Sequence, residues 1–128
     1  MPQYMLLIYG PTGRTPSPEE MAAEMPRWNE YTEGLQAAGV LRAGDALHGS
    51  ESATTVRVRN GETQFTDGPF AETKETLGGY YLIECADLDT ALGHASRMPN
   101  ITYGSVEVRP VVDFSAIPDP GAQTSATA

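Results

Sequence analysis

Residues Thr54 to Thr66 predict a β-hairpin, and this hairpin divides the chain into two halves of similar design. Val56 and Val58 alternate with polar residues, as they do in a strand that has one apolar face. Asn60-Gly61 follows, the pair that suits the positive φ angles of a two-residue hairpin turn. Because the hairpin falls near the middle of 128 residues, the segments before and after it must supply the core.

Each half of the chain has the pattern of strand, helix and strand. Apolar runs predict the strands, while capping residues, glycines and prolines mark where helices begin and end. The predicted strands are Gln3–Tyr9, Val40–His48, Gly78–Cys85 and Ser105–Val112, and the predicted helices run from the cap Ser17 to Gly39 and from the cap Asp87 to Pro99.

Both predicted helices have an apolar stripe. In the first, the stripe includes Met21, Met25, Trp28, Tyr31 and Leu35, and core packing is favoured over a ligand-binding role for it. Proline removes a backbone hydrogen bond, so we expect Pro26 to kink this helix near Ala22 to Met25 or to split it. In the second helix the residues expected to be buried are Leu88, Ala91, Leu92, Ala95 and Met98.

This order of elements predicts a ferredoxin-like α+β domain over residues 1–114, with the hairpin inserted between two βαβ halves. Both helices then cover one face of an antiparallel sheet, and the other face needs a cover of its own. A second copy of the same sheet is the simplest cover, so we expect a homodimer. Residues 115–128 are mostly Pro, Gly, Ala, Ser and Thr and predict a disordered tail.

Composition excludes several classes of function. The net charge of −9 and the scattered basic residues argue against binding to nucleic acid or to an anionic membrane. We expect no membrane span and no signal peptide. The single cysteine, Cys85, is expected as a buried thiol, which fits a reducing cytoplasm. No metal-ligand spacing occurs, and Gly10 to Gly13 lacks the Lys and Ser/Thr of a phosphate loop, so no cofactor is expected.

The least generic stretch is Asp67-Gly68-Pro69-Phe70, which follows the hairpin directly. Asp67 can accept a hydrogen bond from the backbone two or three residues on, and Pro69 fixes its own φ. Gly68 relieves the restriction that a proline imposes on the residue before it. The four residues therefore predict a rigid turn that presents an aromatic ring.

Several motifs together resemble the YCII-related proteins, specifically the branch that has a DGPF domain. They are Tyr4–Tyr9, Ser17–Met21, Leu35–Val40, Thr54–Arg59, Thr66–Glu75, Leu77–Gly79 and Ser105–Pro110. The resemblance implies a dimeric α/β barrel built on a ferredoxin-like fold. It also implies a family without a settled activity, whose bacterial genes often lie near those of extracytoplasmic-function sigma factors.

Better-studied relatives in that family have a histidine in the first helix, paired with an aspartate, as a proposed active site. The resemblance places Trp28 at the position of that histidine, and no histidine occurs between Thr15 and Gly39. Asp45 lies near the position of the aspartate. The resemblance therefore does not supply the His–Asp pair.

The candidate site residues follow from these patterns. The candidate titrating groups are Asp45, His48 and Asp67, although a strand would direct Asp45 and His48 to opposite faces. The candidate ligand-pocket residues are Trp28, Tyr31, Asp67, Phe70 and Tyr81, with either Tyr80 or Tyr81 facing the cleft. His94 is expected in solvent, and Glu72, Lys74 and Glu75 are expected in a solvated loop.

Three classes of function remain open. The first is a homodimeric small-molecule-binding protein with an accessory or regulatory role. The second is an enzyme of YCII type that performs acid–base chemistry on a small organic substrate, and it requires a titratable group inside a concave pocket. The third is an interaction module whose partner is a sigma factor, and it requires an exposed apolar patch.

Overall fold

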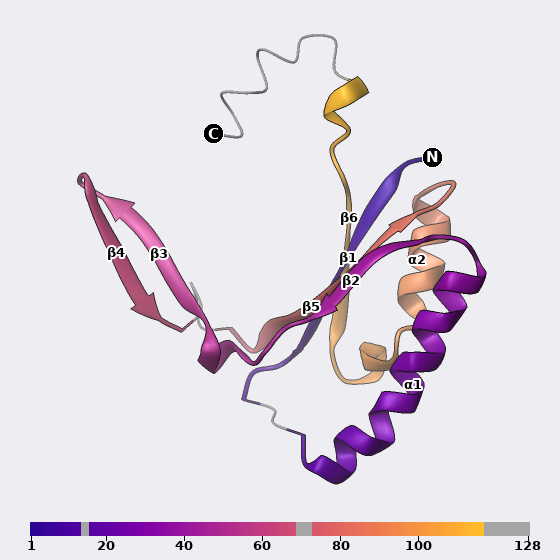
Figure 1. Ribbon diagram of the computed structural model, residues 1–128, viewed down its shortest axis with the longest axis horizontal. Helices are drawn as coiled ribbons and strands as arrows, with labels where there is room; N and C mark the ends of the chain where they lie inside the picture. The colour runs from indigo at the N-terminus through magenta and orange to yellow at the C-terminus, as the bar shows by residue number, and fades with distance from the viewer. Residues whose placement is uncertain (14–15, 69–72, 117–128) are drawn as a thin grey trace.

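A four-stranded antiparallel sheet forms the centre of the computed structural model, which describes residues 1–13, 16–68 and 73–116 (Figure 1). The strand order is β2-β5-β1-β6, and every neighbouring pair is antiparallel. The strands are β1 (Gln3–Pro11), β2 (Leu41–Ala46), β5 (Glu75–Glu84) and β6 (Ser105–Pro110). With two helical crossovers, this α+β arrangement agrees with the predicted ferredoxin-like order.

Both long helices begin at the predicted caps. Helix α1 (Pro18–Ala37) starts with a capping box, in which the Ser17 hydroxyl accepts from the Glu20 N–H at 3.1 Å and the Glu20 carboxylate accepts from the Ser17 N–H at 3.3 Å. Helix α2 (Leu88–Ser96) starts at Asp87, whose carboxylate accepts from the Thr90 N–H at 2.9 Å. Among the residues that the structure describes, no helix is both long and apolar enough to cross a membrane.

Pro26 lies inside α1, yet the helix continues through it as one 20-residue element. Of the two outcomes expected at Pro26, a kink or a split, the split does not occur. Proline deletes a single backbone hydrogen bond, and the packing of the second half of the helix against the sheet offsets that loss.

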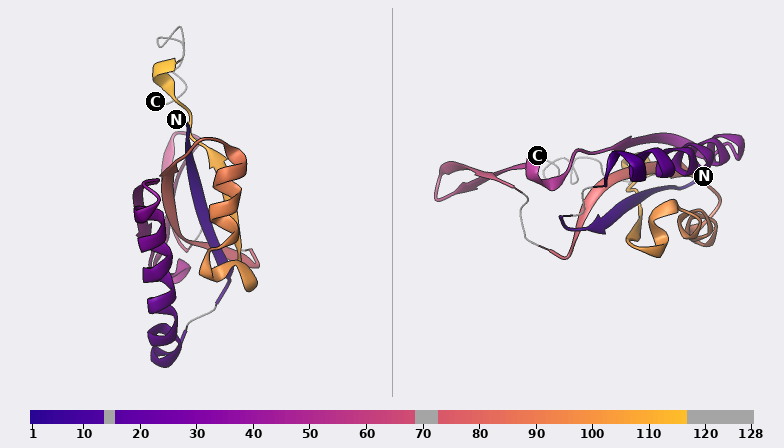
Figure 2. Two further views of the ribbon diagram at one scale, coloured as in Figure 1. Left: turned by 90° about the vertical axis from the view of Figure 1, so that its right-hand side faces the viewer. Right: turned by 90° about the horizontal axis from the view of Figure 1, so that it is seen from below.

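The core lies between the sheet and the two helices, which stand side by side over one face of it (Figure 2). Strands β1 and β5 supply its centre, with Leu6 and Ile83 fully buried. The thiol of Cys85 is buried as predicted, and burial raises its pKa. The buried apolar residues are Tyr4, Leu6, Leu35, Val40, Ile83, Cys85, Ala91, Ala95 and Met98.

The predicted apolar stripes extend beyond the core. Met21 and Met25 are each 50% exposed, since the first turns of α1 reach past the end of the sheet (Figure 1). Leu88 and Leu92 are 44% and 45% exposed, so the prediction that they are buried is wrong. The buried residues of α2 are Ala91 and Ala95, and Leu88 and Leu92 lie on either side of the stripe that these two form.

Several elements are shorter than predicted. Strand β2 ends at Ala46 instead of His48, and β6 ends at Pro110, which leaves Val112 exposed. Helix α2 ends at Ser96, and Pro99 begins a short 3-10 helix, η2 (Pro99–Thr102). Two further 3-10 turns are η1 (Ser50–Ser52) and η3 (Phe114–Ala116). The rest of the predicted tail lies outside the described residues.

The second face of the sheet is not covered by the helices, and its centre is apolar. Alternation along β1 places Met5, Leu7 and Tyr9 on this face, opposite to buried Tyr4 and Leu6. Met5 pairs with Leu82 of β5, and Leu7 pairs with Tyr80. We call this surface the open face of the sheet.

The predicted hairpin is confirmed as β3 (Thr54–Arg59) and β4 (Glu62–Asp67), a separate two-stranded sheet. Asn60 and Gly61 both have positive φ, at 53° and 78°, as the predicted turn requires. The hairpin extends to the side of the main sheet opposite to the helices (Figure 1). Its apolar face remains exposed, at 58% for Val56, 59% for Val58 and 71% for Phe65.

Candidate functional site

A cavity of about 720 Å³ lies where the main sheet meets the hairpin. The end of β1, the segment from β2 to η1, and the beginning of β5 form its walls. Its lining residues are Tyr9, Leu47, His48, Gly49, Ser50, Ser52, Ala53, Thr73, Glu75, Thr76 and Leu77. Of the candidate titrating groups from the sequence, only His48 is among them.

Two glycines bring the walls of this cavity together. Gly78 is skipped in the pairing of β1 with β5, where the register shifts between Ile8 and Tyr9. Its carbonyl accepts from the Leu47 N–H at 2.8 Å, which holds the segment before His48 against β5. A Cβ atom on Gly79 would lie 2.8 Å from the carbonyl oxygen of Asp45, so only glycine allows this approach.

The polar groups of the wall are held by neighbours on β6. The Ser105 hydroxyl donates to the Glu75 carboxylate at 2.8 Å, and the Tyr9 hydroxyl donates to the Glu107 carboxylate at 3.4 Å. Buried Asn100 donates to the carbonyl oxygens of Tyr9 and Ser105, both at 3.1 Å, and so joins the ends of β1 and β6. Glu75 is therefore half-buried in a strand, and its prediction as a solvated loop residue is wrong.

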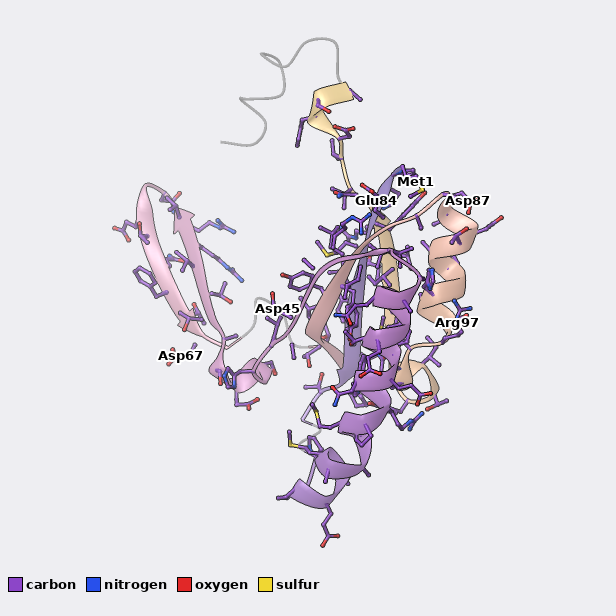
Figure 3. All side chains as sticks on the ribbon, turned by 45° about the vertical axis from the view of Figure 1, so that its right-hand side comes forward. Met1, Asp45, Asp67, Glu84, Asp87 and Arg97 are labelled. Atoms are coloured by element: carbon purple, nitrogen blue, oxygen red, sulfur yellow. The ribbon has the colours of Figure 1, made fainter. Side chains whose placement is uncertain are left out.

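Asp45 and Tyr80 form a second polar feature on the open face. They are opposite each other in β2 and β5, and the Tyr80 hydroxyl donates to the Asp45 carboxylate at 2.8 Å. This hydrogen bond, together with the negative charge of Asp45, raises the pKa of the Tyr80 hydroxyl. Figure 3 shows Asp45 on the side of the sheet that faces the hairpin, although it is not among the residues that line the cavity.

The turn that follows the hairpin is described only at its start. Asp67 is the last residue of β4, at the base of the hairpin (Figure 3). Gly68 has a φ of +97°, its N–H donates to the Ala53 carbonyl at 2.7 Å, and its carbonyl accepts from the Thr55 hydroxyl at 2.8 Å. Because Ala53 lines the cavity, these bonds attach the motif to the cavity wall. The predicted hydrogen bond beyond Asp67 and the side chain of Phe70 lie outside the described residues.

The three other aromatic candidates lie on the helix side of the sheet. Trp28, Tyr31 and Tyr81 pack edge to face, with ring centres 6.5 Å apart for the first pair and 5.6 Å apart for the second. The Tyr81 hydroxyl lies 2.7 Å from that of Thr32, and burial raises the pKa of Tyr31 above its usual range. Tyr80, not Tyr81, therefore faces the open side, and Trp28 packs against the core.

The sequence reasoning missed Tyr9, Glu75 and Leu77 as cavity residues. The segment from Leu77 to Gly79 could have indicated this cavity, because consecutive glycines inside a strand indicate a bulge or a close backbone approach. His94 was also misplaced, because it is half-buried rather than free in solvent. Among the described residues, no group of three His, Cys, Asp or Glu side chains has a metal-binding arrangement.

Comparison with known proteins identifies the family. The model of the YCII-related domain matches residues 2–115, and the chain therefore belongs to the YCII-related family. The chain is also 50% identical over 76 residues to the uncharacterised protein R00369 of Rhizobium meliloti (strain 1021). That match covers 58% of this chain and 61% of the relative.

Proposed function

We propose that this YCII-related protein binds a small organic molecule in the cavity beside His48 and works as a homodimer with an accessory role. The cavity itself is the observation that carries the proposal. Its volume, about 720 Å³, falls within the range of small-molecule sites. It also combines apolar side chains with a few polar groups, which is typical of such sites.

The lining residues indicate which chemical groups a ligand of this cavity would have. Leu47 and Leu77 suit an apolar body, while Glu75 accepts hydrogen bonds and His48 can donate or accept one. Since the Ser105 hydroxyl already fixes one oxygen of Glu75, the carboxylate is preorganised for a ligand. A neutral or cationic molecule with a hydrogen-bond donor fits this set best.

A ligand screen by NMR tests this proposal, because the chain has only two histidines and each lines a different cavity. The screen would use a library of small alcohols, amides and amines. We expect binders to shift the imidazole signals of His48 and leave those of His94 unchanged. In spectra that observe the ligand signals, His48→Ala should weaken binding, whereas His94→Gln should not. If no compound in the library shifts His48, the proposed site is wrong.

The same imidazole supports a YCII-type enzyme as the alternative. Asp45 and Asp67 are not among the cavity lining, so acid–base chemistry in the cavity would depend on His48. Conversion of a bound compound during the NMR experiment, abolished in His48→Ala, would establish this alternative. Binding without conversion across the set of binders would favour the accessory role.

The open face of the sheet supports the homodimer and, with it, the dimeric α/β barrel. Met5, Leu7 and Leu82 give this face an apolar centre that the helices of the same chain cannot reach. A sheet with an apolar face must bury it against another layer, and a second copy supplies the matching surface. The hairpin extends on the same side of the sheet (Figure 2). In a dimer formed through the open face it would lie beside the partner.

The exposed face of the hairpin favours a second candidate function, the binding of another protein. Val56, Val58 and Phe65 form an apolar surface on an arm that has no third strand in the described part of the chain. The family resemblance suggests a sigma factor as the partner. Co-purification with extracytoplasmic-function sigma factors of the same organism tests this, with Phe65→Thr as the variant expected to reduce recovery. Equal recovery with this variant would rule out the arm as the contact.

A further inference from the structure

A groove of about 590 Å³ lies on the helix side of the sheet, between α1 on one wall and the end of α2 with η2 on the other. It is separate from the cavity at His48 and faces away from the open face. Its lining residues are Arg27, Glu30, Tyr31, Gly34, Leu35, Ala38, His94, Arg97, Met98, Pro99, Ile101 and Thr102.

The floor of the groove is apolar, and the wall formed by α1 has small side chains. Leu35 and Met98 are 2% and 1% exposed, and Pro99 is buried beside them. Gly34 on α1 and Ala38 at its C-cap contribute little side-chain volume, and a Cβ atom added to Gly34 would meet nothing within 4 Å. Leu35 and Met98 are themselves covered by the core, so the apolar surface that the groove offers to a ligand includes Ile101, which is 42% exposed.

Hydrogen bonds at the second wall fix the protonation of His94. An Arg97 guanidinium nitrogen lies 3.1 Å from His94 Nδ1, and arginine can only donate, so Nδ1 accepts and Nε2 carries the proton. The Tyr31 hydroxyl donates to the backbone carbonyl of His94 at 2.7 Å and anchors this residue to α1. Burial and the charge of Arg97 lower the pKa of His94, which keeps the ring neutral.

Two arginine side chains place positive charge at the rim of the groove. Arg27 and Arg97 are two of only eight basic residues in a chain with a net charge of −9. In the described part of the chain, the Arg27 side chain makes no hydrogen bond or ion pair, and the Arg97 side chain bonds only to the His94 ring. Glu30 is the one carboxylate among the lining residues, and it leaves the groove with one net positive charge.

We propose that this groove binds a small organic monocarboxylate. The two arginines receive the carboxylate, because a guanidinium donates two parallel hydrogen bonds to such a group. The proton on His94 Nε2 supplies a further donor, and the apolar body of the ligand lies against Ile101. Glu30 disfavours a more highly charged anion such as phosphate.

Benzoate is the probe that tests this proposal on the full chain, with binding followed by the His94 imidazole signals in NMR. We expect saturable shifts of His94 with benzoate, much smaller shifts with benzyl alcohol, and weak binding of inorganic phosphate. Arg27→Gln, which retains the helix propensity and does not touch His94, should weaken benzoate about tenfold through loss of a charged hydrogen bond. Arg97→Gln should weaken it similarly.

Arg42→Gln is the matched control, because Arg42 pairs with Glu84 at 3.0 Å away from the groove. This variant should bind benzoate like the wild type. The proposal is overturned if benzoate leaves His94 unshifted, if benzyl alcohol binds equally well, or if Arg27→Gln binds benzoate as tightly as Arg42→Gln. His48 reports on the other cavity, so failure here is distinguishable from failure of the proposed function.

Discussion

The hydrogen bond between Tyr80 and Asp45 shows how one carboxylate sets the chemistry of its neighbour on the open face. Asp45 favours the neutral phenol over the phenolate, and it therefore raises the pKa of Tyr80. Any stabilisation from this effect is complete below the ordinary tyrosine pKa of 10.0 and is lost as the pH rises through the higher folded-state value.

Asp45→Asn should lower the pKa of Tyr80 part of the way toward 10.0, because the amide can accept the same hydrogen bond, the larger cause of the rise, but has no charge to oppose the phenolate. An alkaline NMR titration with labelled tyrosine measures this value directly. Asp67→Asn is the control, since Asp67 lies at the base of the hairpin, and it should leave Tyr80 unchanged. An unchanged Tyr80 pKa in Asp45→Asn would contradict the assigned cause.

His94 gives a pH dependence of opposite sense. Its folded-state pKa is lowered, so the unfolded chain takes up the proton first as the pH falls. The stability that depends on neutral His94 is therefore complete above pH 6.5 and decreases as the pH falls through the lowered value. His94→Gln should reduce the fall in Tm between about pH 7 and about pH 5. His48→Gln provides the comparison, and an equal fall in both variants would count against the effect.

Single residues were also where the sequence predicted structure most accurately. Ser17 and Asp87 cap their helices, and Asn60-Gly61 makes its turn, because each depends on atoms within about four residues. Glu75 was misplaced for the opposite reason. Its partner, Ser105, lies 30 residues away in the chain, and no local pattern signals that contact.

At the scale of elements, α1 is held to the sheet by few buried side chains. Leu35 is the one residue of the helix that is fully buried, at 2% exposure. Leu35→Ala should therefore lower the free energy of unfolding by about 3 kcal/mol, from lost burial and the cavity left behind. Denaturant unfolding measures this loss.

Leu92→Ala is the matched control, because the same truncation falls on a helix residue that is 45% exposed. It should cost less than about 1 kcal/mol. Equal costs for the two variants would mean that α1 is not anchored through Leu35.

The sequence predicted which segments are helices and strands better than it predicted which of their residues are buried. The helical period in α1 and α2 was real, but it could not show that the sheet ends before Met21 and Met25 or that Leu88 and Leu92 lie beside the contact. The sheet itself is assembled from strands far apart in the chain. The tertiary fold therefore decides which residues of a helix's apolar stripe the sheet buries, and the local sequence does not show this.

The cavity and the groove depend on how the whole chain folds. The cavity is formed by three segments that are distant in sequence and the groove by two, so the sequence could name His48 but not its neighbours Tyr9 and Glu75. The order β2-β5-β1-β6 explains why the two sites are separate. It directs one face of β1 and β5 to the helices and the other to the open side.

The proposal that depends most on this architecture is the homodimer. Stable interfaces bury about 800 Å² from each partner, and the open face is the apolar face of the sheet that the helices leave uncovered. Leu7 lies at its centre, between Tyr80 on β5 and Glu107 on β6. Leu7→Glu would place a second carboxylate beside Glu107, whereas Leu92→Glu makes the same change on the helix side.

Sedimentation velocity at micromolar concentration is the most direct test. We expect the wild type and Leu92→Glu to sediment as dimers, and Leu7→Glu to sediment as a folded monomer with an unchanged far-UV spectrum. A wild-type protein that sediments only as a monomer would contradict the proposed homodimer.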